Sequence, residues 1–371
     1  MTEAPFELPT VRFSRDSTGF ANTLRKRVDA HFKEKGIHKK GDGRMLFKII
    51  VLVGTYFGCL ALISTGATGG GWAFWVTQVA MGLGLAGIGM AVMHDGNHGA
   101  ASQNKMINRF VGGVLEMVGG SSVMWQIQHN VLHHTFTNID GLDEDINPGP
   151  LLRFSPLKPL KPWHRFQHFY AWFFYGLMTL VWVTFKDYVA LNRYKKFGLL
   201  EKMGKSYNKL FFNMTLSKVL YYPVMVGLPL AFSGLGAGQV ILGWLLMHFV
   251  GGLTLALVFQ PAHVLEDHNY PLAEKGGVID DDPLSHQLKT TSNFGTKSRL
   301  LTWYSGGLNH QIEHHLFPNI CHVHYRDIAP IVRKTAEEFG LPYRSSTTFM
   351  DAVRLHTQQL KQLGRPAPSV A

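Results

Sequence analysis

Four long apolar runs constrain the fold of this chain most strongly. They cover approximately residues 45–64, 72–93, 219–232 and 239–259. A helix of about 20 mainly apolar residues is long enough to cross the hydrocarbon core of a bilayer. Charged residues make up only 16% of the chain, against about 25% in ordinary soluble domains. The sequence therefore predicts an all-α polytopic membrane protein with four transmembrane helices.

Short turns pair these runs. Residues 66–71 join the first two runs and residues 233–238 join the last two, so we expect two helical hairpins, each with both open ends on one side. The segment 186–218 carries eight basic residues against two acidic ones. The positive-inside rule assigns such a segment to the cytoplasm. The open ends of both hairpins are therefore predicted at the cytoplasmic face.

Two other apolar stretches, 110–124 and 169–185, are interpreted as interfacial helices. A fifth crossing by 169–185 would separate the last histidine cluster from the first two. Residues 1–44 lack the layout of a signal peptide and are expected to form a cytoplasmic N-terminal arm. Residues 45–325 would form the membrane domain. Residues 326–371 would form a cytoplasmic C-terminal segment. An amphipathic helix is expected to begin near Pro330, because proline is tolerated in the first turn of a helix.

Three histidine clusters lie near the predicted cytoplasmic membrane ends. The first is an HxxxH pair and the second an HxxxHH cluster; the third has the pattern HQxxHH. His263 follows the fourth apolar run and comes within reach of the same site. Imidazole is a favoured ligand for iron, copper, nickel and zinc. The members of the clusters are His94 and His98; His129, His133 and His134; and His310, Gln311, His314 and His315.

The remaining polar groups have simpler interpretations. His248 lies within the fourth run and is expected to form a neutral, hydrogen-bonded helix contact. The acidic run from Asp140 to Asp145 is expected to be a solvated loop. Cys59 and Cys321 have no CxxC partner, so no disulfide scaffold or zinc ribbon is predicted. The histidines expected to be ordinary polar residues are His268, His286, His322, His324 and His356.

The number of histidines points to two metals. Eight or nine imidazoles exceed the needs of one tetrahedral zinc ion, and magnesium and calcium prefer oxygen ligands. Two non-haem iron ions fit the clusters. With O2, they could form an oxidant able to attack an unactivated C–H bond. Four spans with interfacial helices would hold an alkyl chain. The expected reaction is therefore an iron-dependent oxidation of an alkyl chain.

The third cluster carries the most specific resemblance. The stretch Gly306-Gly307-Leu308-Asn309-His310-Gln311-Ile312-Glu313-His314-His315-Leu316-Phe317-Pro318 resembles the third histidine box of membrane fatty acid desaturases of the front-end and linoleoyl-CoA type, in which glutamine replaces the first histidine. By this resemblance, which runs from about residue 45 to 324, Gln311, His314 and His315 ligate metal. The other ligands that it implies are His94, His98, His129, His133, His134 and His263.

Two positions depart from the family pattern. His310 is an additional histidine beside the third box, and it is either a ligand or a neighbour of the ligands. Stearoyl-type relatives have an asparagine one helical turn before the histidine that corresponds to His263. This chain has Phe259 at that position. Gln260, one residue later, is a candidate for a ligand or a water-mediated contact.

The resemblance also implies partners. Electrons would come from a separate donor, either a ferredoxin or a cytochrome b5-type protein with its reductase, because no HPGG haem motif is present and 44 residues before the first span are too few for a fused domain. The net charge of +11 would attract an acidic donor or an anionic headgroup. Binding to nucleic acid is not indicated. Candidate headgroup contacts are Lys158, Lys161 and Arg165.

The expected function is thus an O2-dependent desaturase that introduces a cis double bond into an acyl chain carried by coenzyme A or a lipid. A di-iron membrane hydroxylase is the alternative, because it would use the same clusters and only the product distinguishes the two. A histidine-rich metal transporter is a more distant alternative. A transporter should place its ligands within the spans, and only His248 lies there.

Overall fold

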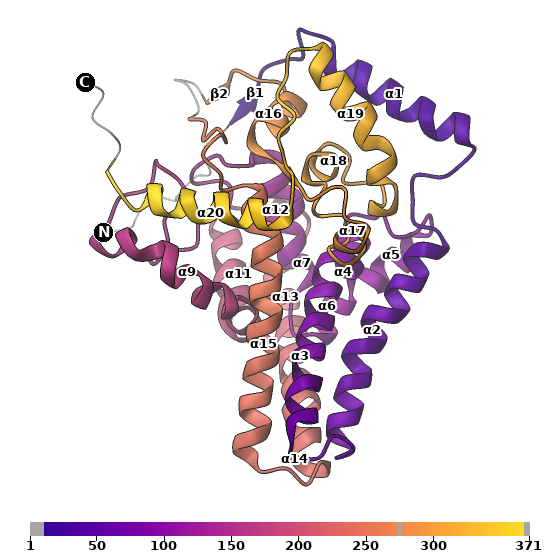
Figure 1. Ribbon diagram of the computed structural model, residues 1–371, viewed down its shortest axis with the longest axis vertical. Coiled ribbons are helices and arrows are strands. Elements are labelled where there is room, and N and C mark those ends of the chain that lie inside the picture. The colour runs from indigo at the N-terminus through magenta and orange to yellow at the C-terminus, as the bar shows by residue number, and fades with distance from the viewer. Residues whose placement is uncertain (1–10, 273–276, 367–371) are drawn as a thin grey trace.

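The computed structural model describes residues 11–272 and 277–366, and these residues form mainly helices (Figure 1). Two small parallel sheets join segments that are distant in sequence. β1 (Arg12–Phe13) pairs with β2 (Val278–Ile279), and β3 (Asn293–Phe294) pairs with β4 (Ser345–Ser346). The region around residues 278–294 therefore holds segments from both ends of the described chain.

Four helical segments are long and apolar enough to cross a membrane, as the sequence predicts. They lie side by side and form the narrow lower part of the molecule in Figure 1, where short turns join α2 to α3 and α14 to α15. The segments are α2 (Gly43–Ser64); α3 (Trp72–Gly87), η1 (Ile88–Val92) and α4 (Met93–Asn97); α13 (Tyr207–Tyr222), η5 (Pro223–Gly227) and α14 (Leu228–Phe232); and α15 (Ala237–Phe259) with η6 (Gln260–Ala262).

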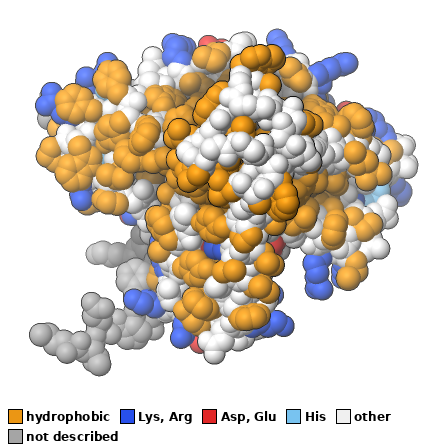
Figure 2. All heavy atoms as spheres, turned by 90° about the horizontal axis from the view of Figure 1, so that it is seen from below, with side chains coloured by type: hydrophobic (Ala, Val, Ile, Leu, Met, Phe, Trp, Pro, Cys, Tyr) orange, Lys and Arg blue, Asp and Glu red, His pale blue; other side chains and the backbone are white. Residues whose placement is uncertain are grey.

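The outer surface of these segments is apolar. Phe47, Phe212 and Val219 are each more than half exposed, and hydrophobic side chains cover much of the face seen from below (Figure 2). Apolar exposure on this scale is unfavourable in water and is expected where lipid is the solvent. The surface therefore agrees with the length and hydropathy of the four segments.

Small residues bring the second and fourth segments together. A Cβ atom at Gly82 would lie 2.6 Å from the carbonyl oxygen of Met247, and one at Gly243 would lie 2.4 Å from the ring of Phe74. Helices α3 and α15 thus approach more closely than larger side chains would permit. Their upper ends lead directly into His94 and His263.

Between the second and third segments, further helices follow one another, and none of them is among the helices long and apolar enough to cross a membrane. The stretch 169–185, expected to be interfacial, is accordingly not among the four candidate spans. These elements are α5 (Lys105–Gly112), α6 (Val114–Met117), α7 (Ser122–Trp125), η2 (Gln126–His133), α8 (His134–Phe136), η3 (Pro162–Phe166), α9 (Gln167–Gly176), α10 (Met178–Val181), η4 (Trp182–Lys186), α11 (Asp187–Lys196) and α12 (Leu199–Lys202).

The wide upper part of Figure 1 contains the helices near the two ends of the chain. Phe20, Leu24 and Val28 of α1 share a hydrophobic core with Ile312 of α18 and Ile328 of α19. The N-terminal helix therefore packs with the third histidine cluster. The elements of this part are α1 (Phe20–Lys35), α16 (Pro283–Thr290), α17 (Arg299–Tyr304), α18 (Gln311–Leu316), η7 (His322–His324), α19 (Tyr325–Glu338) and α20 (Phe349–Leu363).

Two predicted helix boundaries were wrong. The third segment begins at Tyr207, twelve residues before the predicted start, because Lys218 is buried in an ion pair with Asp187 (Nζ–Oδ2 3.0 Å) and does not interrupt the helix. The helix α19 begins at Tyr325, so Pro330 lies in its interior and not in its first turn.

Candidate metal centre

The three histidine clusters and His263 meet where the long helices end. His94 and His98 follow the π-helix η1, and His129 and His133 lie in the π-helix η2. A π-helical turn contains one more residue than an α-helical turn, and such turns are frequent at functional sites. His129 and His133 of the second cluster are therefore spaced by π-helical and not by α-helical geometry.

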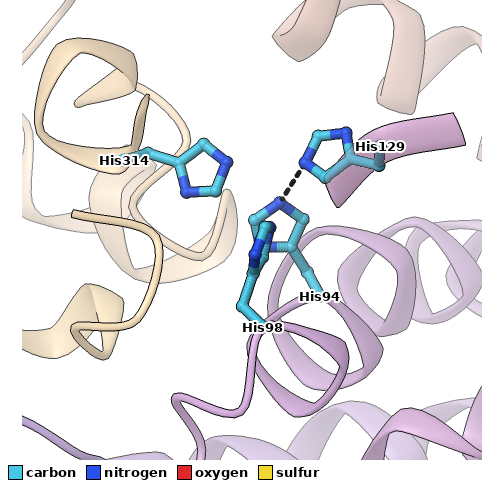
Figure 3. A group of neighbouring side chains, drawn as sticks. All are labelled: His94, His98, His129 and His314. Atoms are coloured by element: carbon cyan, nitrogen blue, oxygen red, sulfur yellow. Dashed lines mark hydrogen bonds between the residues drawn. The ribbon is translucent and has the colours of Figure 1, made fainter. Parts of the chain in front are cut away.

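One group of four imidazoles surrounds a common space. A ring nitrogen from each of His94, His98, His129 and His314 lies within 4.8 Å of the others. Figure 3 shows His94 and His98 rising from one helix, with His129 and His314 approaching from opposite sides. The Nε2 atoms of His94 and His129 are 3.3 Å apart. Four nitrogen donors from three separate elements thus converge.

A second set of imidazoles lies next to this group. Ring nitrogens of His133, His263 and His315 lie within 4.8 Å of one another, and so do those of His134, His314 and His315. Nε2 of His134 is 2.9 Å from Nε2 of His314. Because His314 belongs to both sets, the two sites are adjacent.

Several buried nitrogens of this centre lack hydrogen-bond partners among the described residues. Among the described residues, Nε2 of His98, His133, His263 and His315 has no partner, although such buried groups are normally paired. A bound metal ion would satisfy these lone pairs. The donor set consists of imidazoles in two adjacent groups, so the residues present fit two transition-metal ions.

Partners on the other ring nitrogen orient several of these histidines. Nδ1 of His315 lies 2.8 Å from Oε1 of Gln287, and Nδ1 of His314 lies 3.2 Å from the hydroxyl of Tyr325. Such contacts fix the tautomer and would direct Nε2 of each ring toward a bound metal ion. Neither Gln287 nor Tyr325 was predicted, and no sequence motif marks them.

The acidic run is not the solvated loop that was predicted. Asp143 is buried, and both its carboxylate oxygens lie 3.1 Å from Nδ1 of His133. Glu144 pairs with Arg193, and Asp145 accepts a hydrogen bond from Gln128 at 2.6 Å. The loop folds over the second cluster because its carboxylates find partners there. The acidic run lies close to the second cluster in the sequence, and this was the one signal that could have predicted their contact.

Burial controls the protonation of the imidazoles. Desolvation lowers the pKa of His98, His129, His134, His314 and His315, and the neighbouring imidazoles lower it further. Neutral imidazole is the form that binds metal. His133 is different. Burial lowers its pKa, but Asp143 and Asp145 outweigh burial, so the pKa is raised.

The remaining candidate ligands differ in their surroundings. His310 is absent from the groups of converging ligand atoms, and its Nδ1 lies 3.5 Å from the Glu313 carboxylate. Gln311 is fully buried, and its side chain interacts with that of His263. The side chain of Gln260 is half-buried, and the ring of Phe259 packs 5.5 Å from that of His129.

The headgroup candidates separate into two kinds. Lys158 forms an ion pair with Asp140 at 2.9 Å. Lys161 and Arg165 line a cavity of about 770 Å³ together with Lys361 and Arg365. Beside it, Phe166 and Phe169 are more than half exposed. This surface combines cations with apolar side chains.

The other histidines singled out in the sequence analysis are buried. As predicted, His248 makes a helix contact, since its Nε2 lies 2.8 Å from the Tyr221 hydroxyl. Nδ1 of His322 lies 2.7 Å from Asp95, and these two residues form another possible ligand group with Cys321. His268, His286 and His356 are hydrogen-bonded inside the protein, and Nδ1 of His324 lies 3.5 Å from a nitrogen of Arg44.

Comparisons with known proteins agree with this centre. Residues 70–347 match the family model described as fatty acid desaturase. The sn-1 linoleoyl-lipid 6-desaturase of Synechocystis is 34% identical over 94% of this chain and 96% of that protein. The acyl-lipid (8-3)-desaturase of Physcomitrium patens is 34% identical over 97% of this chain and 75% of that protein. The sn-1 linoleoyl-lipid 6-desaturase of Arthrospira platensis is 31% identical over 94% of this chain and 93% of that protein.

The matched region contains all three histidine clusters and His263, and the relatives cover nearly the whole chain. The resemblance drawn from the third cluster is thereby confirmed, including its front-end type. The protein is an oxidoreductase of lipid metabolism, and its apolar helices make it a membrane protein. The chain belongs to the fatty acid desaturase family.

Proposed function

We propose that this desaturase uses two histidine-bound iron ions and O2 to introduce a cis double bond into an acyl chain of a membrane lipid. The convergence of the imidazoles from three clusters on two adjacent sites carries the proposal. The names of the relatives refer to acyl-lipid or linoleoyl-lipid desaturation, which favours a lipid-bound acyl chain over a coenzyme A thioester.

The proposed ligands divide between two sites. His94, His98, His129 and His314 hold one ion, and His133, His263 and His315 hold the other. His134 lies between them, and Gln311 is proposed as a ligand from the third box. His310 and Gln260 are assigned to the surroundings of the centre, because no converging group contains His310 and Gln260 is only half-buried. Iron bound there would supply, with O2, the oxidising power to remove hydrogen from an unactivated C–H bond.

The chain itself orients the ligands and keeps water out. Asp143 and Tyr325 fix the rings of His133 and His314. The indole of Trp125 stacks on His129 with centroids 4.4 Å apart, and Phe259 packs against the same ring. These aromatic side chains give the ligands an apolar surrounding and would restrict the access of water to them.

For the arrangement in the membrane, we propose two helical hairpins with the metal centre at the cytoplasmic face. Residues 1–44 and 326–371, which flank the membrane domain (residues 45–325) in the sequence, would both lie in the cytoplasm. The eight basic residues between positions 186 and 218 support this orientation. The exposed aromatic residues beside Lys161 and Arg165 would anchor the protein at the interface, with the cations near lipid headgroups.

Electrons would come from a separate donor, a ferredoxin or a cytochrome b5-type protein with its reductase. The net charge of +11 would steer an acidic donor toward the cytoplasmic surface. Steering of this kind weakens as ionic strength rises. Turnover limited by donor binding is therefore expected to fall when salt is added.

The deciding experiment is expression in a host with a simple lipid composition, with the electron donor co-expressed and linoleic acid supplied. Lipids are separated by class, and gas chromatography–mass spectrometry locates any new double bond. We expect a new double bond in lipid-bound acyl chains. His134→Ala should abolish it and lower bound iron, whereas His38→Ala, which alters an exposed histidine, should do neither. A hydroxylated product would contradict the proposal.

A further inference from the structure

A cavity with basic walls lies beside the metal centre and contains none of its proposed ligands. It has a volume of about 460 Å³ and lies between the start of α2, α17 and residues 322–326. Four cationic side chains line it: Arg44, Lys48, Arg299 and Arg326. The cavity is therefore suited to an anion.

Two of these four cations have no carboxylate partner among the described residues, and the buried Lys48 meets the nearest carboxylate, Asp95, only through His322. Asp42 pairs with Arg44 at 2.8 Å, but within residues 11–272 and 277–366 no carboxylate pairs with Arg299 or Arg326. Lys48 is buried, and its single acceptor there is Nε2 of His322 at 2.5 Å. An ammonium group has three donors, so two remain for a ligand. An anion would compensate a buried cation that is otherwise costly.

The cavity opens where the protein meets lipid. Phe47 and Leu300, on the two flanking helices, are more than half exposed. Trp303 lines the cavity and also lines an apolar groove of about 720 Å³ formed with Leu83 and Tyr304. In Figure 1, α17 lies at the junction of the long helices and the wide upper part. A molecule with an anionic head and an apolar chain matches these two neighbouring spaces.

We propose that the basic cavity binds the phosphate headgroup of an anionic phospholipid, with one acyl chain along the groove on the other side of Trp303. This inference rests on the proposed acyl-lipid function and specifies its substrate. The enzyme would act on an anionic phospholipid in preference to a neutral glycolipid.

A short series of side chains connects this cavity to the metal centre. Lys48 contacts His322, whose Nδ1 lies 2.7 Å from Asp95. Asp95 adjoins His94 in sequence, and its Oδ1 is 3.8 Å from Nδ1 of that ligand. A headgroup held by Lys48 would therefore be bound close to the site of the reaction.

The test uses the full-length iron-loaded enzyme in zwitterionic detergent micelles. Binding of fluorescent phosphatidylglycerol is titrated for the wild type, for the double variant Arg299→Gln/Arg326→Gln and for its charge-conserving counterpart Arg299→Lys/Arg326→Lys. Loss of two charge-assisted contacts should weaken binding roughly tenfold or more, and the lysine variant should retain most of it. The matched control is Lys105→Gln/Arg109→Gln, which removes two exposed charges from α5 and should leave binding unchanged.

Several outcomes would overturn the inference. Equal binding of phosphatidylglycerol by the wild type and the Gln double variant would show that the basic cavity does not bind the headgroup. Equally tight binding of glycerol 3-phosphate, which has no acyl chain, would make the cavity a site for a soluble anion. If the cavity binds phosphatidylglycerol but the wild type desaturates only neutral glycolipids, the substrate assignment fails and the proposed function stands. If only acyl-coenzyme A is desaturated, the proposed acyl-lipid function itself fails.

Discussion

The carboxylate of Asp143 lies against Nδ1 of His133, with both oxygens at 3.1 Å. The opposite nitrogen of this ring, Nε2, is buried without a partner among the described residues. Asp145 approaches the same Nδ1 to 3.4 Å. The acidic loop therefore makes His133 more basic and directs its free nitrogen into the centre.

Replacing Asp143 with asparagine should lower both bound iron and activity by about 10- to 100-fold, the usual cost of losing a partner that orients a metal ligand. The amide keeps the size of the side chain and removes its charge. Iron per protein is measured by mass spectrometry and activity by product formation. Asp140→Asn, in the same loop but paired with Lys158, serves as the control. Normal iron content in the Asp143 variant would refute the role assigned to this carboxylate.

His310→Ala should retain two iron ions per protein, because no converging group contains His310. His314→Ala should lose iron at both positions, because this residue belongs to two of those groups. Both histidines are buried in the same cluster, so each variant controls for the loss of a buried ring in the other. Iron content and membrane insertion are measured together. Loss of iron in His310→Ala would make it a ligand.

Acidification should destabilise the protein in part through His356. Burial lowers the pKa of His356 to about 4, and its ring lies 2.8 Å from the Tyr175 hydroxyl and 2.9 Å from the carbonyl of Val264. Below about pH 6.5 the unfolded chain binds a proton at this histidine and the folded chain does not, so stability decreases as pH falls. The loss is about 1.4 kcal/mol at pH 5.5, one unit below the unfolded pKa.

Thermal unfolding of the wild type and of His356→Gln at pH 7.5 and pH 5.5 measures this contribution. The variant should lose less stability between the two pH values than the wild type. The comparison uses the change with pH, so any constant destabilisation by the substitution cancels. An identical decrease in both proteins would show that His356 takes up its proton in the folded state.

Gly306→Ala should disrupt the third box. Gly306 has a φ of +61°, and a Cβ atom there would lie 2.4 Å from the carbonyl oxygen of Met90. Gly340 has a φ of +67° but nothing within 4 Å of such an atom. Gly340→Ala should therefore cost only the conformational strain, about 1 kcal/mol. Gly306→Ala should lower the unfolding temperature further and reduce iron content. Equal effects would mean that the close approach of Gly306 to η1 is unimportant.

The sequence alone determined the class of the protein and the identity of its principal residues. Length and hydropathy are properties of contiguous segments, so the four spans could be read from the apolar runs. The histidine clusters are also local, and the wording of the third box carried the family. The exact helix ends could not be read in this way, because the burial of Lys218 against Asp187 depends on another part of the chain.

Tertiary structure decided how those residues meet. The choice of Asp143, Gln287 and Tyr325 as partners of the imidazoles depends on distances between separate elements. The exclusion of His310 from the converging groups depends on the direction of a side chain within its own cluster. The basic cavity brings together Lys48 and Arg299, which are about 250 positions apart in the sequence. Such contacts arise from packing between distant segments, and no local pattern encodes them.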